Sequence, residues 1–193
     1  MTRAQFDREQ VIRDATQLFW QQGFSGASMQ QVVKATGLKP GSLYLAFGSK
    51  EGLYQAALES YTSQLRAAVC RVLDDAPSVG EGVCQLVLQL VEECGSGNYC
   101  SCFLIKSQLE LAASGSDLLH CISGYLSQME DLYADYLSRE HSPEQARLYA
   151  ASLMLHVLGL RVYGYLGRSR ETTIAAAKAG LPWLPWHKVD VPD

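Results

Sequence analysis

The strongest constraint on the fold is the recurrence of apolar residues at helical spacing, broken by residues that begin or end helices. Within residues 7–22 the apolar side chains fall at i, i+1, i+4, i+7 and i+8, the stripe of an amphipathic helix: Val11, Ile12, Ala15, Leu18 and Phe19. We expect Gly23 to stop this helix. No window shows the sustained apolar–polar alternation of a strand. The chain is therefore predicted to be all-α.

Capping signals predict about nine helices in total. Ser28 with Gln31 has the spacing of a capping box, and Ser142 is followed by a proline suited to the first helical position. Gly37 is expected to end the second helix with a positive φ. The remaining helices are expected at about 40–47, 49–73, 79–94, 101–113, 116–140, 143–167 and 170–181. Because Pro182, Pro185 and Pro192 interrupt it, the tail after residue 181 is predicted to be non-helical.

The charge distribution bears on the possible partners. The 193 residues carry a formal net charge of -4, which argues against indiscriminate nucleic-acid binding. Residues 1–60 contain six Lys/Arg and five acids, net +1, so the acidity lies in the rest of the chain. The first part is therefore able to approach phosphates.

Several features favour a cytoplasmic protein without a membrane segment. Residues 1–20 are polar and charged, so no signal peptide is expected. The most apolar stretch, Leu148–Leu160, is shorter than the ~20 residues that a membrane helix needs. In a reducing compartment the six cysteines are not expected to form a disulfide framework.

Two short helices joined by residues 36–39 have the dimensions of a helix-turn-helix, whose second helix enters the major groove. Gly41 and Ser42 are small, so the start of that helix could approach DNA, where its free N–H groups favour phosphates. Lys39, Tyr44 and Lys50 could contact the backbone. From spacing alone, a small helical bundle with ordinary surface residues remains an alternative.

The same region resembles the TetR family of repressors. The match runs over about residues 8–60 and ends in the string L-Y-x-x-F-x-x-K-E-x-L, which is found here at Leu43 to Leu53. The resemblance implies a sequence-specific DNA-binding transcriptional repressor, not an enzyme. It also implies a helix-turn-helix domain over 1–53, linked by the helix that runs to about residue 73 to an effector-binding and dimerisation domain over 54–193.

The resemblance also implies residue roles in DNA binding. Ser28, Tyr44 and Lys50 fall on phosphate-contacting positions. Positions that face base edges or the groove floor are occupied by Gln30, Pro40, Gly41, Ser42 and Leu45. Leu43 and Phe47 are expected in the core, packed onto Val32 and Leu18. Lys39 stands where the family often has a serine cap, so we expect a weaker cap and a greater positive charge.

The helix predicted at 143–167 is apolar nearly all round, so we expect a partner subunit to cover it. The resemblance implies a four-helix bundle across a two-fold axis, and a palindromic operator in double-stranded DNA with half-sites about 34–36 Å apart. The predicted interface residues are Leu148, Leu155, Leu158, Val162, Ile174 and Leu181. The alternative is a central helix buried within one subunit.

By the same resemblance, residues 75–140 should hold the effector pocket. The candidate lining residues are Tyr99, Cys102, Phe103, Lys106, His120, Tyr125, Tyr133, His156 and Tyr163. Apolar walls with a few polar tips suit a lipophilic small molecule. For each aromatic residue the alternative is an ordinary place in the core.

Cys102 suggests a second way of sensing. A thiol at a helix N-terminus is activated, and Lys106, one turn further on, could add positive charge. The segment from Cys102 to Leu111 resembles a TetR subgroup that represses enzymes detoxifying electrophiles, typified by the N-ethylmaleimide-reductase repressor. We therefore hypothesise that modification of Cys102 weakens DNA binding, the alternative being an inert buried thiol.

Other functions have less support. Cys100 and Cys102 with His120 or Cys121 could form a soft metal site, but the C-x-C spacing is weak, and we expect neither a metal nor another cofactor. A cysteine-dependent enzyme and a helical protein-binding adaptor remain alternatives. The chain has no G-x-S-x-G, P-loop or Rossmann fingerprint.

Overall fold

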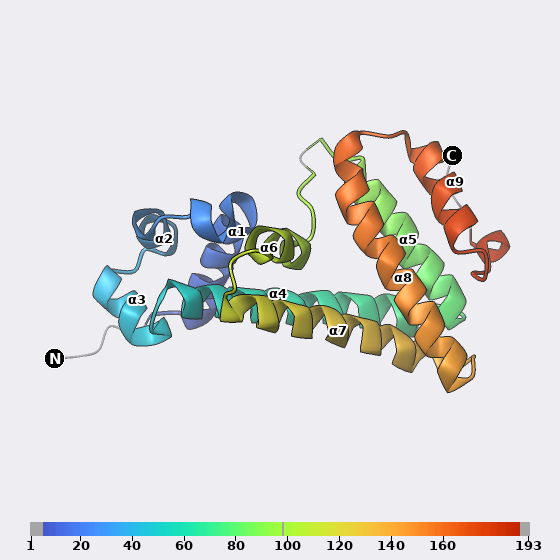
Figure 1. Ribbon diagram of the computed structural model, residues 1–193, viewed down its shortest axis with the longest axis horizontal. Helices are drawn as coiled ribbons and strands as arrows, with labels where there is room; N and C mark the ends of the chain where they lie inside the picture. Colours follow the sequence, from blue (N-terminus) through green and yellow to red (C-terminus); the bar gives the residue numbers. More distant parts are fainter. Residues whose placement is uncertain (1–5, 98, 190–193) are drawn as a thin grey trace. The chain divides into compact units, whose positions relative to one another are not determined.

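The computed structural model describes residues 6–97 and 99–189, and within them it contains nine α-helices, two short 3₁₀ helices and no strand (Figure 1). The all-α prediction is confirmed. The α-helices are α1 Arg8–Gly26, α2 Met29–Thr36, α3 Pro40–Phe47, α4 Lys50–Asp75, α5 Val79–Cys94, α6 Phe103–Leu111, α7 Asp117–Leu137, α8 Pro143–Tyr163 and α9 Arg170–Gly180. The 3₁₀ helices are η1 Gly164–Leu166 and η2 Trp186–Lys188.

Contacts divide the chain into two compact units. The first contains residues 1–64 and 103–125, and the second contains residues 65–102 and 126–193. The helix-turn-helix segment thus shares its packing unit with α6, which comes from the middle of the chain. A functional boundary after residue 53 remains a prediction.

The predicted capping signals act as expected. The Ser28 hydroxyl accepts from the Gln31 N–H while the Gln31 side chain accepts from the Ser28 N–H, which completes the capping box of α2. Gly37 ends α2 with φ of 68°. Ser142 caps α8, and Pro143 occupies its first turn. Local sequence therefore determines where these helices start and stop.

The first helix differs from the prediction. Gly23 breaks the helical backbone with φ of 77°, but the element resumes and extends to Gly26. At this kink the N–H groups of Phe24 and Ser25 donate to the Glu110 carboxylate of α6, at 2.9 and 2.7 Å. A Cβ at position 23 would lie 2.5 Å from a Glu110 oxygen, so both the φ value and the close approach require glycine.

Three other helices are shorter than predicted. The α6 helix covers residues 103–111 rather than 101–113, α7 ends at Leu137, and α8 ends at Tyr163, where the chain tightens into η1 before Gly167 turns with φ of 60°. The tail contains one 3₁₀ turn, at which the Trp186 indole donates to the Leu181 carbonyl. Residues 190–193, including Pro192, lie outside the described residues.

The core of the first unit is centred on Tyr54. Its ring makes edge-to-face contacts with Phe19, Phe24 and Phe103, at centroid distances of 4.9, 5.0 and 5.4 Å. Tyr54, Phe19 and Phe103 are almost fully buried. These rings join α4 to α1 and α6, so the helix-turn-helix segment packs onto α6 through an aromatic cluster.

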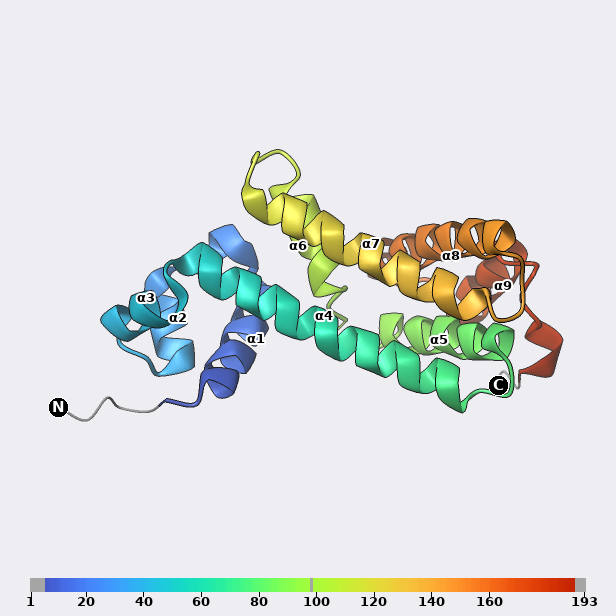
Figure 2. The same cartoon turned by 90° about the horizontal axis from the view of Figure 1, so that it is seen from below.

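The core of the second unit lies between α5 and α8, which run side by side, with α9 packed against α5 (Figures 1 and 2). Val83 of α5, Leu137 of α7 and Leu153 of α8 meet in this core. The Trp183 ring stacks on Tyr149, at 4.1 Å between centroids. Among the described residues, no helix is both long and apolar enough to cross a membrane.

Candidate nucleic-acid interface and sensor region

The third helix presents one face to the core and one to solvent. Leu43 is buried, whereas Tyr44 is 51% exposed and Leu45 is 73% exposed. Pro40 and Gly41 at the start of α3 are also exposed, and Ser42 is half-buried. Large exposed side chains on a short helix that is anchored from behind suit insertion into a groove.

The start of α3 offers fewer free N–H donors than we expected. Pro40 has no N–H, and the N–H of Ser42 donates to the Lys39 carbonyl at 3.0 Å. The Lys39 side chain makes no capping bond, which confirms the expected weak cap, and it is exposed. Positive charge at this end of the helix is therefore supplied by the Lys39 ammonium.

The second helix contributes Ser28 and Gln30. The Ser28 hydroxyl is engaged as the cap of α2, and Gln30 is exposed. Next to it, the Gln31 amide donates to the Gln22 side chain at 2.8 Å, which ties α2 to α1. Gln30 is thus held on a fixed helix with its side chain accessible.

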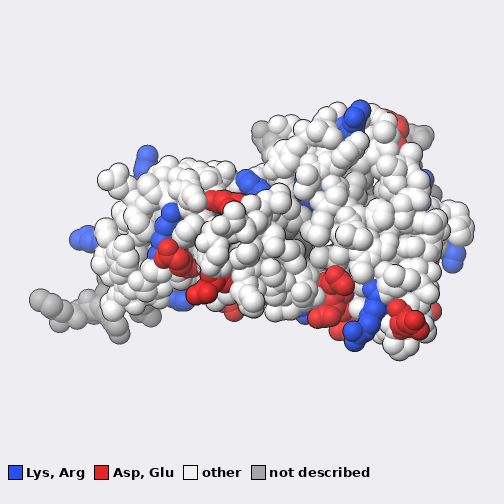
Figure 3. Space-filling model, viewed as in Figure 1, with Lys and Arg blue, Asp and Glu red and all other residues white. Residues whose placement is uncertain are grey.

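The start of α4 carries the Lys50 ammonium 4.4 Å from the centroid of the Phe24 ring. The neighbouring Glu51 has a lowered pKa, first because its own backbone N–H bonds its carboxylate and then because of the Ser49 hydroxyl. Glu51 therefore remains ionised and offsets part of the positive potential. On the face shown in Figure 3 the charged side chains are scattered rather than gathered into one basic patch.

Phe47 is only half-buried, which corrects the prediction that it belongs to the core. The Arg8 guanidinium covers its ring at 4.4 Å and donates to the Ala46 carbonyl at 3.2 Å. Arg8 thus braces the end of α3. Sequence reasoning did not single it out, because its only signal was a positive charge at the start of the first helix.

The eighth helix also has two faces. Ala146, Ala150 and Leu153 pack in the core of the second unit, whereas Leu155 is 72% exposed. Leu148 and Val162 are likewise exposed, and Leu158 is half-buried. The predicted interface residues Ile174 and Leu181 are buried within the single chain, so they belong to its own core.

The nine candidate effector residues are divided between the two packing units. Phe103, Lys106, His120 and Tyr125 belong to the first unit. The other five, Tyr99, Cys102, Tyr133, His156 and Tyr163, belong to the second. Phe103 is a core residue, His120 is exposed, and the Lys106 ammonium donates to the Trp20 carbonyl at 2.5 Å. The bond to Trp20 gives Lys106 a structural role that we did not predict.

Cys102 lies directly before the first residue of α6 and is 5% exposed. Burial raises the pKa of Tyr133 to about 12, and Cys102 is among the smaller contributors to that increase. Within the described residues, no group of three His, Cys, Asp or Glu side chains could hold a metal ion.

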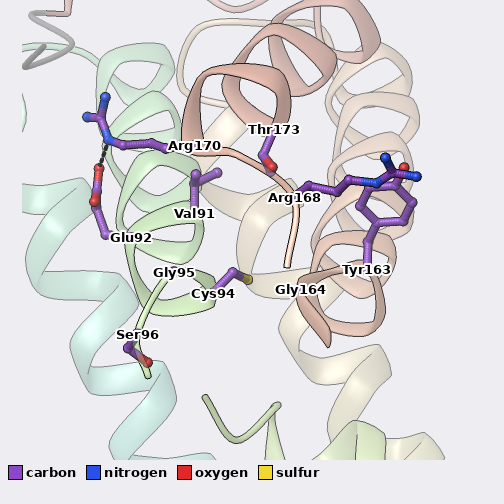
Figure 4. Close-up of a pocket in the computed structure, with 10 residues that line it drawn as sticks. All are labelled: Val91, Glu92, Cys94, Gly95, Ser96, Tyr163, Gly164, Arg168, Arg170 and Thr173. Atoms are coloured by element: carbon purple, nitrogen blue, oxygen red, sulfur yellow. Dashed lines mark hydrogen bonds and ion pairs between the residues drawn. The ribbon is translucent and has the colours of Figure 1, made fainter. Parts of the chain in front are cut away.

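Tyr163 is the one candidate that lines a cavity of about 430 Å³ in the second unit. Its other walls come from α5, η1 and α9 and include Cys94, Gly164 and Thr173 (Figure 4). We did not predict this cavity, because its residues are far apart in the sequence and share no motif.

Residues 11–57 match the family model described as bacterial regulatory proteins of the tetR family. The chain is 29% identical to the HTH-type transcriptional repressor BdcR of Escherichia coli (strain K12) over 177 residues, which cover 91% of this chain and 88% of BdcR. Residues 11–57 of this chain are therefore a TetR-family segment, and nearly the whole chain is similar to a transcriptional repressor.

Solved structures of transcriptional regulators are similar to this chain over nearly its whole length. A cysteine mutant of the TetR family transcriptional regulator CifR, complexed with 26-bp double-strand operator DNA, superposes with a TM-score of 0.81 at 27% identity and covers 96% of this chain and 100% of that one. The reduced form of Escherichia coli NemR has the same fold, with a TM-score of 0.73 at 20% identity, covering 89% of this chain and 95% of NemR.

Proposed function

We propose that this protein is a TetR-family repressor that reads a palindromic operator through α3 and leaves it in response to an effector or to modification of Cys102. The observation that carries the proposal is the exposed face of α3, with Tyr44 and Leu45 outward, in a chain similar over 96% of its length to an operator-bound regulator. Because the proposed target is operator DNA, we place the protein in the cytoplasm.

The DNA contacts divide into two kinds. Tyr44, Lys39 and Lys50 contact phosphates, and Ser28 holds the start of α2 beside the backbone. Base edges and the groove floor are contacted by Gln30, Leu45 and the segment Pro40–Ser42. Since the exposed part of α3 carries few polar groups, sequence selection rests on Gln30, on apolar contacts and on DNA shape.

A homodimer places two such helices on one duplex. The exposed side of α8 carries an apolar strip formed by Leu148, Leu155 and Val162. In a single subunit this strip faces water, and a partner subunit would cover it. A second copy of this strip is the partner of matching chemistry. The spacing of the two α3 helices then depends on how the two subunits pack.

Modification of Cys102 would act through α6. At 5% exposure the thiol is nearly closed off from solvent, so an added group must displace the residues around it, and the start of α6 follows directly in the chain. Within the first unit, α6 is fastened to α1 by Glu110 and Lys106 and to α4 by Ser107. Displacing α6 would therefore strain the base on which the helix-turn-helix rests.

The experiment is a fluorescence-anisotropy titration of labelled DNA from upstream of the gene, at several salt concentrations. We expect saturable binding that weakens steeply with salt, because phosphate contacts release counterions. Treatment with N-ethylmaleimide should release the DNA from the parent protein but not from a Cys102→Ser variant, and Cys70→Ser is the matched control. Equal release from the parent and from Cys102→Ser would remove the thiol mechanism, and absence of binding would remove the repressor proposal.

A further inference from the structure

The cavity of about 430 Å³ in the second unit has the size of a ligand site, and its lining is half apolar and half polar (Figure 4). Pockets for small molecules occupy about 300–1,000 Å³ and combine apolar walls with a few polar groups. Here the buried Val91 and the half-buried Cys94 of α5 form apolar wall, and the exposed Tyr163 also lines the cavity.

The floor of the cavity is packed tightly. A Cβ at Gly164 would lie 2.6 Å from the Cys94 sulfur and 2.9 Å from the Tyr99 ring, so the end of α8 reaches α5 only because residue 164 is glycine. The Tyr99 hydroxyl donates to the Arg161 carbonyl at 2.7 Å and fixes the same corner. The cavity is therefore bounded by contacts that hold its shape.

Two arginines give the cavity a positive rim. Arg170 is paired through Nε with the Glu92 carboxylate at 2.5 Å, which neutralises one charge. The Arg168 guanidinium lies 5.9 Å from the centroid of the Tyr163 ring, and among the described residues no carboxylate lies within 4 Å of it. The lining thus carries a formal charge of +1, from two arginines and one glutamate.

We propose that this cavity binds a small anionic amphiphile, a carboxylate on a short alkyl or aryl body. The body packs against Val91, Cys94 and the Tyr163 ring, and the carboxylate pairs with Arg168. Arginine suits this task because its planar guanidinium binds a carboxylate through two parallel N–H donors. As the effector site of the repressor this inference rests on the proposed function, whereas the binding site itself does not.

Binding in this cavity would change the exposed apolar surface at the end of α8. Tyr163 lines the cavity and is also one of the exposed apolar residues at the end of α8, beside Val162. An occupant that fixes the Tyr163 ring and the start of α9 therefore changes the surface offered to a second copy. Ligand binding could therefore alter how the two subunits of the proposed dimer pack.

The test is isothermal titration calorimetry of the full chain with octanoate, and with octanamide as the neutral analogue. We expect saturable octanoate binding, weaker binding of octanamide, and an affinity for octanoate about tenfold lower in Arg168→Gln because a charge-assisted pair is lost. Arg168→Lys should retain part of the affinity, and Arg147→Gln, an exposed arginine of α8 outside the cavity, should bind like the parent.

Amide chemical shifts locate the site independently, and octanoate should move the signals of Gly95, Gly164 and Thr173. Equal affinity of Arg168→Gln and the parent, equal binding of octanamide, or shifts confined to other residues would overturn the proposal. The calorimetry contains no DNA, so a failure of the repressor proposal would leave its result unchanged. Octanoate-dependent release of DNA is measured separately and tests only the effector role.

Discussion

The Tyr54 hydroxyl oxygen and Ser107 Oγ lie 2.5 Å apart in the core of the first unit. Ser107 has one hydroxyl proton, which it donates to the Phe103 carbonyl at 2.7 Å, so Tyr54 is the donor of this pair. The bond joins α4 to α6 immediately beside the helix-turn-helix.

Replacing Tyr54 by phenylalanine should lower the free energy of unfolding by about 1 kcal/mol, because one buried hydrogen bond is lost while the ring stays in place. Urea denaturation measures this difference. Tyr44→Phe is the control, since its side chain is half-exposed on α3 and should leave stability unchanged while weakening DNA binding. Identical stability of Tyr54→Phe and the parent would show that the bond contributes nothing.

Alkaline pH should destabilise the protein through its buried tyrosines. Burial raises the pKa of Tyr54 and of Tyr133 to about 12. A folded-state pKa above the unfolded value of about 10 means that the stabilisation is complete below pH 10 and is lost as the pH rises toward 12. Tyrosinate absorbance and far-UV circular dichroism should therefore change together in this window. If all ten tyrosines ionised near pH 10 and the helicity stayed unchanged, the predicted loss of stability through buried tyrosines would be contradicted.

Lys50→Ala and Gln30→Ala should weaken DNA binding in different ways. Losing the proposed Lys50 phosphate contact should weaken binding to all sequences and reduce the salt slope by about 1. Losing Gln30 should cost about 1–3 kcal/mol, mainly at particular base pairs. Anisotropy titrations against the upstream DNA and single-base variants measure both, with the exposed Arg71→Ala of the second unit as control. If neither variant differs from the control, the assigned positions are wrong.

Leu155→Glu should convert the proposed dimer to a monomer at micromolar concentration. The side chain is 72% exposed in the single chain, so a carboxylate there leaves the subunit core intact but places a charge in the proposed interface. Analytical ultracentrifugation gives the mass, and Gln89→Glu, on the exposed side of α5, is the control. A parent protein that is already monomeric would refute the dimer.

The sequence was most informative where a local signal decides the structure. Ser28, Gly37 and Ser142 act within one helical turn, so their roles could be predicted without knowledge of the fold. Beyond Gly23, by contrast, the backbone of α1 is hydrogen-bonded to the Glu110 carboxylate, which is more than eighty residues away in the sequence. No local pattern could have indicated that contact.

The same distinction applies to the sites. Tyr44 and Leu45 could be placed outward because their positions follow from a short motif and one helix face. Ile174 was misplaced because an apolar residue on a terminal helix looks the same whether its own subunit or a partner covers it. The cavity beside Cys94 was missed because it is formed where three helices meet.

Dimethyl sulfate footprinting of the protein on its upstream DNA tests most directly whether α3 lies in the major groove twice per complex. The reagent methylates guanine N7 in the major groove and adenine N3 in the minor groove. We predict two clusters of protected guanine N7 positions on one face of the duplex, their centres about one helical turn apart. Three results would contradict the proposed mode of binding. They are protection of adenine N3 alone, a single cluster of protected guanines, and no protected position although the DNA is fully bound.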